Sequence, residues 1–504
     1  MFNLLEKEIG NRSITENGAV GYRSSGSALV DLNYMVSSLR NTSTGDIEML
    51  FHMAYMENRE YALKWLFFAR DIRGGLGERR LFRIIYKYLA WIDRKAFIQN
   101  LPIVAEYGRW DDVISMLGIR DELDTHILYL VQCQLNEDLD NMRHNKPVSL
   151  LAKWLPSENA SSPNTRMLAK KVRKGLGLSS KDYRKMLSQL RGYSNVVEVQ
   201  LCANEWDAVD YEKVPSLANL KYRRAFLRND EDRRIAYLDS VKKGGSKLNM
   251  SVANPVDVVT RYSENMMLRR EVKPLDETLE LAWKNLSDVN IEDTLVVADG
   301  SGSMTMRVSG KTTALDVANA LAIYTSEHNK GEYKDKYITF SHTPQFVDLS
   351  NRDTLKHKLE TARRYNEVAN TNIEAVFELI LAVAVKHNVP KEEMIKNVLI
   401  ISDMEFDSAQ KGFRTPSNPL TPALFEKIKE TYNDLGYDLP KLIFWNVNSR
   451  TKTIPLIENE LGVTLVSGFS QNVLRMVMSN KYDPWAVLKE TLDNPRYDKV
   501  QVQN

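Results

Sequence analysis

Residues 294–304 read TLVVADGSGSM, and this stretch decides the fold of the C-terminal half of the chain. Its first five residues form an apolar run without alternation, which is typical of a strand buried on both faces of a parallel sheet. The run ends at Asp299, and the glycines that follow permit a loop in which Asp299, Ser301 and Ser303 stand at alternate positions. Such a loop can turn one carboxylate and two hydroxyls toward a single point.

Apolar runs also occur at 337–340, 398–401, 442–445 and 463–466, and helix-like stretches lie between runs at 312–329, 372–387 and 421–434. This alternation predicts a doubly wound parallel sheet over residues 286–504. Asp403 follows the run VLIIS as Asp299 follows TLVVA, so we expect both carboxylates at the carboxyl edge, where ligands bind in open α/β folds. Hard oxygen ligands suit Mg²⁺, or another divalent cation such as Mn²⁺ or Ca²⁺, better than zinc.

The Asp-x-Ser-x-Ser pattern after a buried first strand resembles the metal-ion-dependent adhesion site of the von Willebrand factor A domain, which has a Rossmann-like fold. The resemblance implies a metal-binding set of Asp299, Ser301, Ser303, Thr371 and Asp403. It also implies an open coordination position for an acidic residue of a partner. Glu405 stays outside this set, and Thr312 and Thr313 compete with Thr371 although they are more typical of a helix N-cap. The alternative is that DGSGS is only a polar loop between strand and helix.

The first 285 residues have a different pattern. From about residue 45, apolar residues recur at three- and four-residue spacing, which predicts amphipathic helices. Breaks at 73–77, 101–102, 107–108, 146–147 and 156–163 divide them into helices of ordinary length. We therefore expect an all-α domain over residues 1–285, although no repeat of fixed period is evident. The segment 251–287 contains two prolines and is predicted to join the two halves.

The net charge of +2 over 504 residues conceals a difference between the halves. Residues 1–285 carry 43 Lys and Arg against 37 Asp and Glu, whereas residues 286–504 carry 25 against 29. The excess is concentrated between residues 166 and 191, where one acid, Asp182, stands among nine bases: Arg166, Lys170, Lys171, Arg173, Lys174, Lys181, Arg184, Lys185 and Arg191. Such a field attracts phosphates. The alternative is a solvated basic face of two helices.

Several N-terminal motifs occur in a characteristic order. They are NGAVGY (17–22), SGSALVD (25–31), ARDIRGGLGER (69–79), YGRWDD (107–112), KWLPSEN (153–159), ANEW (203–206) and VPS (214–216). Followed by an A domain, this series resembles the Ro/TROVE-type proteins, and more closely a TROVE-like family found in phages, bacteria, fungi and plants. The resemblance implies HEAT-like helical repeats in a ring closed by the A domain. It also implies non-enzymatic binding of small non-coding or misfolded RNA in a ribonucleoprotein.

The resemblance and the charge pattern together give an expected RNA surface, made of Arg166, Lys170, Lys171, Arg173, Lys174, Lys181, Arg184 and Lys185. Tyr183 and Tyr193 lie close enough in sequence to stack on bases, and Trp110 is expected to be buried. A rival hypothesis is a protein-interaction scaffold that captures a partner's acidic residue on the metal. A hydrolase is not favoured, because no His or Lys is placed as a general base beside the two aspartates, and His342 is expected in a loop.

The remaining features predict a cytoplasmic protein with no membrane association and no evident small-molecule substrate. Cys133 and Cys202 are expected to be buried free thiols, and the N-terminus lacks a secretory pattern. No run approaches 18 apolar residues. The glycine-rich stretch 73–80 lacks the Gly-Lys-Ser/Thr ending of a P-loop. We expect it to be a turn between helices, with a role in phosphate contact as the alternative.

Overall fold

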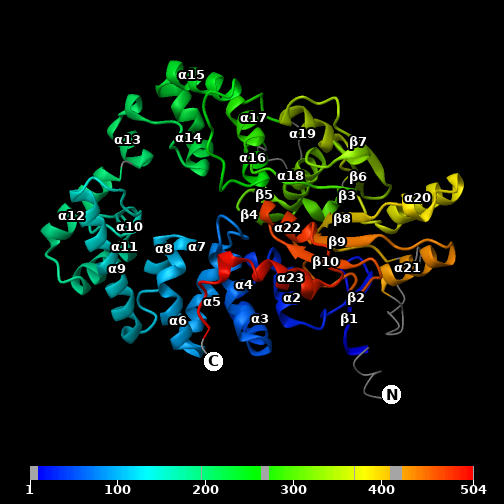
Figure 1. The fold of residues 1–504 in the computed structure, drawn as a ribbon, viewed down its shortest axis with the longest axis horizontal. Helices are drawn as coiled ribbons and strands as arrows, with labels where there is room; N and C mark the ends of the chain where they lie inside the picture. The colour runs from blue at the N-terminus through cyan, green and yellow to red at the C-terminus, as the bar shows by residue number, and fades with distance from the viewer. Residues whose placement is uncertain (1–8, 195, 263–271, 368, 409–422, 503–504) are drawn as a thin grey trace. The chain divides into compact units, whose positions relative to one another are not determined.

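The computed structural model describes residues 9–194, 196–262, 272–367, 369–408 and 423–502. Its contacts define two compact units, which we call the sheet unit (residues 1–62 and 250–494) and the helical unit (residues 63–249 and 495–504). The expected fold class, a helical region and a parallel-sheet domain, is confirmed (Figure 1). The boundaries differ from a single division after residue 285, because the first 62 residues belong to the sheet unit and the last ten to the helical unit.

The sheet unit is built on six strands in the order β10-β9-β8-β3-β6-β7. Their bounds are β3 Thr294–Asp299, β6 Lys336–Phe340, β7 Gln345–Asp348, β8 Asn397–Ser402, β9 Lys441–Asn446 and β10 Val463–Ser467. All neighbours are parallel except β7, which runs antiparallel to β6 at the edge. Every residue of β3 and β9 is buried, as expected for apolar runs without alternation. Each predicted apolar run lies in one of these strands.

Helices cover this sheet. They are α18 Ala314–Glu327, α19 Leu355–Arg364, α20 Glu374–His387, α21 Leu424–Asp434, α22 Leu474–Val477 and α23 Pro484–Leu492. Helix α18 packs against β3, β6 and β8. On α21, Phe425 meets Phe444 of β9 with ring centroids 4.9 Å apart and Phe377 of α20 at 5.7 Å. A small hairpin of β4 Arg307–Ser309 and β5 Thr312–Thr313 precedes α18. These helices pack against the central strands, from whose ends the loops of the candidate site begin.

The segment 251–287, expected to join the two halves, is instead part of the sheet unit. It forms α16 Pro255–Tyr262 and α17 Glu277–Lys284. The Trp283 ring packs edge-on against Tyr324 of α18, and its indole N–H donates to Glu327 at 2.6 Å. Pro255 does not mark a connector, because it is the first residue of α16. The N–H that proline lacks would have no partner within the helix at that position.

The first part of the chain also packs on the sheet. It forms the hairpin β1 Arg12–Ile14 and β2 Val20–Tyr22, followed by α2 Ala28–Tyr34 and α3 Thr44–Glu57. Helix α2 packs against β10, and Asn446 of β9 donates its side-chain N–H to the carbonyl of Tyr34 at 2.8 Å. The Ser37 hydroxyl lies 2.9 Å from that of Ser467. The sheet unit is therefore completed by residues far away in sequence.

The helical unit is a series of helices, as the periodicity predicts. They are α4 Arg59–Arg70, which begins in the sheet unit, α5 Arg79–Ile92, α6 Arg94–Asn100, α7 Val104–Tyr107, α8 Trp110–Ile114, α9 Asp121–Arg143, α10 Leu151–Trp154, α11 Pro163–Gly175, α12 Ser180–Tyr193, α13 Val197–Ala203, α14 Ser216–Asn229 and α15 Glu231–Lys242. Short 3-10 helices occur in both units: η1 Ser38–Arg40, η2 Leu101–Ile103, η3 Trp206–Ala208, η4 Gly302–Thr305, η5 Gly331–Tyr333, η6 Lys391–Glu393, η7 Gln471–Val473 and η8 Pro495–Tyr497. Nearly all predicted breaks fall between helices.

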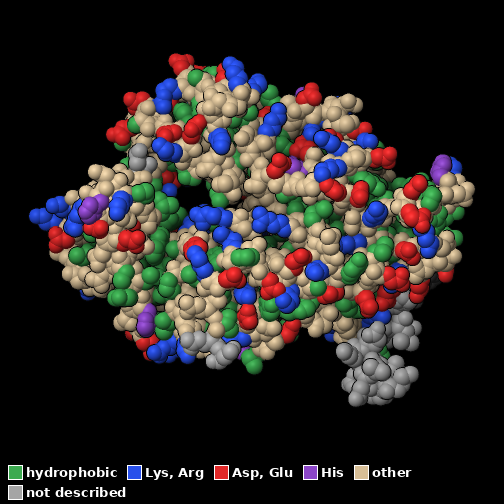
Figure 2. All heavy atoms as spheres, in the orientation of Figure 1, with side chains coloured by type: hydrophobic (Ala, Val, Ile, Leu, Met, Phe, Trp, Pro, Cys, Tyr) green, Lys and Arg blue, Asp and Glu red, His purple; other side chains and the backbone are tan. Residues whose placement is uncertain are grey.

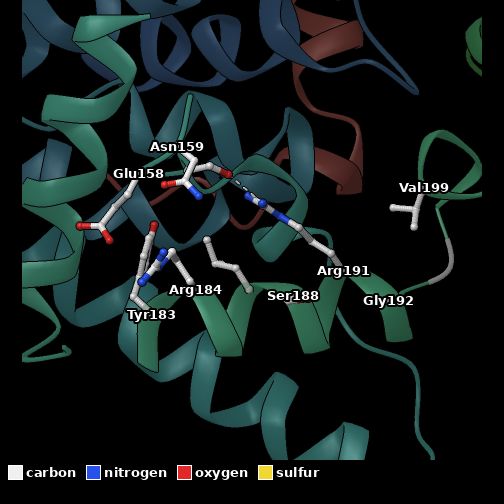
Figure 3. A pocket seen from close by; sticks show the side chains of 10 residues that line it. Glu158, Asn159, Tyr183, Arg184, Ser188, Arg191, Gly192 and Val199 are labelled. Carbon is white, nitrogen blue, oxygen red and sulfur yellow. Dashed lines mark hydrogen bonds between the residues drawn. The ribbon is translucent and has the colours of Figure 1, made fainter. Parts of the chain in front are cut away.

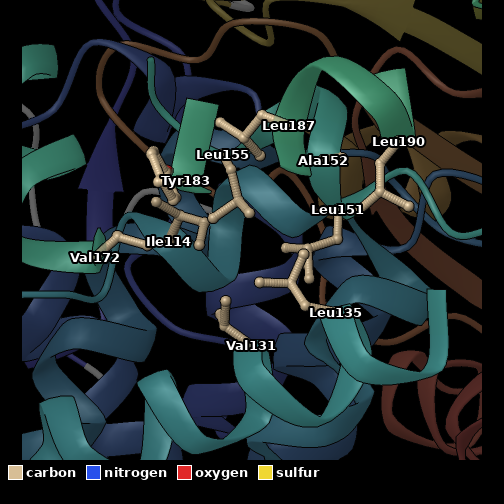
Figure 4. Packing of buried hydrophobic residues seen from close by; sticks show 10 residues of the cluster. All are labelled: Ile114, Val131, Leu135, Leu151, Ala152, Leu155, Val172, Tyr183, Leu187 and Leu190. Atoms are coloured by element: carbon tan, nitrogen blue, oxygen red, sulfur yellow. The ribbon is translucent and has the colours of Figure 1, made fainter. Parts of the chain in front are cut away.

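A hydrophobic core holds α8 to α12 together (Figure 4). Its buried members are Ile114, Val131, Leu135, Leu151, Ala152, Leu155, Val172, Tyr183, Leu187 and Leu190. Trp110 packs against this cluster and is partly buried, which agrees with the expected core position. Tyr183 is fully buried and donates to the carbonyl of Pro156 at 2.8 Å. The expectation that Tyr183 stacks on bases is therefore wrong.

Two of the N-terminal motifs meet in a buried ion network. Arg70 ends α4, and Asp112 lies in α8 within the YGRWDD motif; Arg70 Nη2 is 2.7 Å from Asp112 Oδ2. The other carboxylate oxygen accepts from Arg83 Nε at 2.6 Å. A Cβ at position 108 would lie 2.4 Å from Asp112 Oδ2, so the glycine is required by close approach. The motif residues named here thus have a structural role.

The glycine-rich stretch 73–80 is a turn between α4 and α5, with Glu78 at the N-cap of α5, as predicted. Gly77 has a φ of 73°, which glycine adopts without strain. The neighbouring Asp71 carboxylate accepts from Arg496 Nη2 at 2.7 Å and from the Tyr497 hydroxyl at 3.2 Å. This turn therefore holds the C-terminal segment of the helical unit.

Candidate functional site

The two aspartates predicted to share a site stand at the ends of neighbouring parallel strands. Asp299 is the last residue of β3 and Asp403 directly follows β8, and β3 pairs with β8 in the sheet. Asp299 is 1% exposed and Asp403 is fully buried. The Ser402 hydroxyl donates to Asp299 Oδ2 at 2.5 Å. The structure therefore brings both carboxylates to one edge of the sheet.

The loop after β3 turns its two serines toward these carboxylates. The backbone N–H of Ser301 donates to Asp299 Oδ1 at 2.8 Å, and the hydroxyls of Ser301 and Ser303 are 3.0 Å apart. Burial raises the pKa of the Asp403 carboxyl, and the neighbouring Ser303 hydroxyl counteracts part of that rise by stabilising the ionised form. The set of side chains expected at alternate positions is thus assembled around one point.

Thr371 comes from the loop that precedes α20. The N–H of Gly302 donates to the carbonyl of Ala369 at 3.0 Å, so the serine loop and the threonine loop are directly joined. Thr371 is 1% exposed. Its competitor Thr313 is the N-cap of α18, with its hydroxyl accepting from the N–H of Asp316, and is therefore committed to a structural role.

Position 300 has room only for glycine, because two polar side chains approach its backbone closely. A Cβ at this position would lie 2.9 Å from Thr339 Oγ1 and 3.1 Å from Asn366 Oδ1. Thr339 Oγ1 and Asn366 Nδ2 are buried and have no hydrogen-bond partner among the described residues. Unpaired buried polar atoms are costly, so a water molecule or another polar group beside these two atoms would be stabilising.

The two buried carboxylates make each other's ionisation less favourable. Burial, and then the charge of Asp403, raise the pKa of Asp299 to about 7. Burial also raises the pKa of Asp403, while Arg450 acts in the opposite direction. Two adjacent carboxylates in a dry environment ionise together only beside a positive charge. Among the described residues no group of three or more His, Cys, Asp or Glu is arranged to hold a metal. Carboxylate and hydroxyl oxygens fit Mg²⁺.

Three residues next to this site were not found by sequence reasoning. Arg450, in the loop after β9, places Nη1 2.9 Å from Asp403 Oδ2 and Nη2 2.7 Å from Glu16 Oε2. Asn17 donates its side-chain N–H to Thr371 Oγ1 at 3.3 Å and to the carbonyl of Glu405 at 2.6 Å. Glu16 and Asn17 lie in the turn of the β1–β2 hairpin, at the start of the NGAVGY motif (17–22). Nothing in that motif indicates that it lies beside the two aspartates.

Glu405, left outside the expected metal set, joins these segments. It is fully buried and accepts from the backbone N–H groups of Glu16, Arg450 and Thr451 at 2.9, 2.7 and 2.9 Å. Its carboxylate is thus saturated by donors from the hairpin and from the loop after β9. Glu405 is a positioning residue for both segments.

The expected RNA surface is only partly free in the structure. Lys171 pairs with Asp124, Arg173 pairs with Glu158 at 2.8 Å, and Arg166 and Arg191 donate to backbone carbonyls of neighbouring turns. The remaining five are exposed and have no ion pair among the described residues: Lys170, Lys174, Lys181, Arg184 and Lys185. Of these, Arg184 also donates its Nε–H to the carbonyl of Ser180 at 3.1 Å, within its own helix. We call these five the basic face. Lys and Arg side chains reach the surface in the region of α12 (Figure 2).

A cavity of about 450 Å³ lies beside α12. It is lined by Ser157, Glu158 and Asn159 of the KWLPSEN motif on one side and by Arg184, Ser188 and Arg191 on the other. Figure 3 shows Arg191 extending toward the 157–159 segment, where it donates to Ser157 Oγ at 2.8 Å. Arg184 therefore belongs both to the basic face and to the wall of the cavity.

Other predicted features were located as follows. Tyr193 is 36% exposed and donates to the carbonyl of Lys146. His342 is exposed in the turn between β6 and β7, as expected of a loop residue. Cys133 and Cys202 are free but exposed, so the expected burial is wrong; both lie on outer faces of helices, α9 and α13. In the part of the chain that is described, no helix has the length and apolar character needed to cross a bilayer.

Comparison with known proteins gives both family models and relatives. The model described as "Domain of unknown function (DUF2828)" matches residues 15–127 and 122–293, and "Domain of unknown function (DUF7788)" matches residues 293–499. The match to DUF7788 begins at residue 293, directly before β3, the first strand of the six-stranded sheet in the sequence. "Uncharacterized protein L728" of Acanthamoeba polyphaga mimivirus is 30% identical over 526 residues, which cover 96% of this chain and 88% of that protein.

Among solved structures, the Ro (RSR) protein of Deinococcus radiodurans aligns with 89% of this chain and 98% of its own, at 15% identity and a TM-score of 0.44. The two family models and the viral relative cover nearly the whole chain, which therefore belongs to the family described as "Domain of unknown function (DUF2828)", with a C-terminal region of the type described as "Domain of unknown function (DUF7788)".

Proposed function

We propose that this chain is a non-enzymatic RNA-binding protein whose helical unit binds small structured or misfolded RNA through the basic face. The observation that carries the proposal is the set of five exposed cations on α11 and α12 without a carboxylate partner among the described residues. Surface cations that are not paired within the protein remain available to phosphates. The order of Ro-like motifs in the sequence supports RNA as the polyanion.

The geometry of the two helices favours phosphate contact. Lys170 and Lys174 are four residues apart on α11, and Lys181, Arg184 and Lys185 are three and four apart on α12, so each set shares one side of its helix. Directly beneath, Ala169, Val172 and Leu187 are buried. The helices are therefore held by the core while their charged side chains point outward. The cavity beside Arg184 offers space for one unstacked base, a common mode of RNA recognition.

Filter binding of a small structured RNA at several salt concentrations tests the proposal. The triple variant Lys170→Glu, Lys174→Glu, Lys181→Glu is expected to lose most of its affinity for RNA. The slope of log affinity against log salt concentration is expected to become shallower by the amount that corresponds to roughly two to three lost phosphate contacts. A matched control reverses three other exposed lysines of the helical unit, Lys146, Lys243 and Lys247. The proposal fails if the wild-type protein does not bind at low salt, or if both triple variants bind equally.

We propose that the sheet unit holds Mg²⁺ through Asp299, Ser301, Ser303, Thr371 and Asp403. When bound, the ion would supply two positive charges beside the buried aspartates. The unpaired polar atoms beside Gly300 and the carboxylate pair support this assignment. The rival function, capture of an external acidic residue, is less well supported, because residues of the chain's own hairpin lie against the site and four of its five residues are buried.

A further inference from the structure

The guanidinium of Arg450 lies between two carboxylates from distant parts of the sheet unit. Nη1 contacts Asp403, a proposed metal ligand, and Nη2 contacts Glu16 on the hairpin. The third nitrogen, Nε, is buried and has no hydrogen-bond partner among the described residues. Asp403 is fully buried, whereas the Glu16 side chain is 50% exposed. Arg450 therefore acts as the counter-charge of the buried aspartate while a second acceptor stands on its outer side.

The second acceptor is held in place by the hairpin. The Thr15 hydroxyl donates to the carbonyl of Phe406 at 2.6 Å, and the N–H of Ser408 donates to the carbonyl of Asn17 at 3.1 Å. At the other end, Tyr22 and Ile454 exchange two backbone hydrogen bonds of 2.8 Å. Glu16 lies between these anchors, and its own N–H is bonded to Glu405. The carboxylate that faces Arg450 thus has a fixed backbone position.

We propose that Arg450 is a built-in competitor of the divalent cation and sets the cation affinity of the site, with Glu16 as its alternative partner. The inference rests on the metal site proposed above. Without the ion, Arg450 neutralises Asp403. With the ion bound, Arg450 gives up Asp403, because two cations at one carboxylate repel each other, and keeps its contact with Glu16. The side chain needs only to rotate outward, since Nη2 is already on Glu16.

This arrangement makes opposite predictions for the two residues. Removing Arg450 removes the competitor, so Arg450→Met is expected to bind Mn²⁺ or Mg²⁺ about tenfold or more tightly, equivalent to about 1.4 kcal/mol. Removing the alternative partner leaves Arg450 on Asp403, so Glu16→Gln is expected to bind several-fold more weakly. The double variant is expected to match Arg450→Met, since Glu16 acts only through Arg450. Arg450→Lys keeps the charge and is expected to remain close to wild type.

Direct measurement of Mn²⁺ binding by electron paramagnetic resonance, with Mg²⁺ competition followed by calorimetry, provides the test. The matched control is Arg364→Met, an exposed arginine at the end of α19, and circular dichroism checks that each variant is folded. If Arg450→Met binds as wild type does, or if the double variant binds more weakly than Arg450→Met, the inference is overturned. Asp299→Asn tests the metal site separately. If Asp299→Asn loses Mn²⁺ binding while the other variants bind as wild type does, the metal site stands and only the inference about Arg450 fails. If neither the wild-type protein nor any variant binds Mn²⁺, the proposed metal site fails as well. Should Arg450→Met not fold, Glu16→Gln and Arg450→Lys still decide the question.

Discussion

Arg70 and Asp112 form an ion pair that is almost completely shielded from water: the Nη2 to Oδ2 distance is 2.7 Å, and the side chains are 2% and 0% exposed. Asp112 is bonded by Arg83 as well, and the backbone N–H of Arg109 donates to it at 3.1 Å. The pair joins the end of α4 to the start of α8. Burying two charges is costly, and the cost is offset only while every partner is present.

Removal of the acidic partner is therefore expected to be severe. Asp112→Ala leaves Arg70 charged and unpaired in the interior, and we expect a loss of about 3–5 kcal/mol in the free energy of unfolding, measured by urea denaturation of the full chain. The exposed Asp207→Ala is the matched control and is expected to change stability by less than about 0.5 kcal/mol. Equal stability of the two variants would mean that this network is not needed for stability.

Gly300 is expected to control cation affinity more than stability. A methyl group in Gly300→Ala would meet Thr339 Oγ1 and Asn366 Oδ1 and displace the loop that carries Ser301 and Ser303. We expect Mn²⁺ affinity to fall at least tenfold, with the melting temperature lowered by only a few degrees. Gly45→Ala is the control, because a Cβ there has nothing within 4 Å. Unchanged Mn²⁺ affinity in Gly300→Ala would argue against a role for the serine loop.

Stability of the metal-free protein is expected to fall as the pH rises. Burial, and then Asp403, raise the pKa of Asp299 to about 7, whereas that of an unfolded aspartate is about 3.9. Between these values the folded state retains a proton that the unfolded state has lost, so the free energy of unfolding decreases with increasing pH. Urea denaturation in EDTA at pH 5 and pH 8 measures the change, and Asp299→Asn is expected to reduce it. A steeper decline in that variant would contradict the assignment.

The hairpin is expected to depend on Gly21. A Cβ at this position would lie 2.6 Å from the carbonyl oxygen of Ile454, inside the bridge between Tyr22 and Ile454. Gly21→Ala should therefore detach β2, and hydrogen exchange should become faster at the amides of Tyr22 and Ile454. Gly10→Ala has no neighbour within 4 Å and serves as the control. Protected amides in both variants would show that the bridge tolerates the methyl group.

The sequence predicted the strands that are recognisable locally and missed elements whose signal is weak. Runs such as VLIIS are buried on both faces and need no partner to be identified. The edge strand β7 is short and alternates exposed with buried residues, and α19 is rich in charges, so neither forms an apolar run. The burial of Tyr183 had a signal that was overlooked, since Leu187 and Leu190 follow at helical spacing on the core face.

The same distinction applies to the candidate site. Asp299, Ser301 and Ser303 lie in one loop, so their spacing alone predicts that they share a point. Glu16 and Glu405 are bonded although 389 residues separate them, and nothing in either local sequence indicates the other. Arg450 lies in the loop after β9, and its local sequence does not distinguish it from other charged loop residues. Long-range pairing of this kind depends on the complete fold, which composition and periodicity do not describe.

The exchange of chain ends between the two units has a consequence for synthesis on the ribosome. Arg496, which donates to the carboxylate of Asp71 in the helical unit, is translated 425 residues after it. The hairpin and α2 bond to β9 and to segments that follow β8 and β9, all translated several hundred residues later, at Phe406, Asn446 and Ile454. Neither unit can therefore complete these contacts until the later segment has been translated. A nascent chain that stops before residue 495 leaves the buried Asp71 without Arg496. Premature termination would be detected as misfolding in the helical unit, far in sequence from the missing residues.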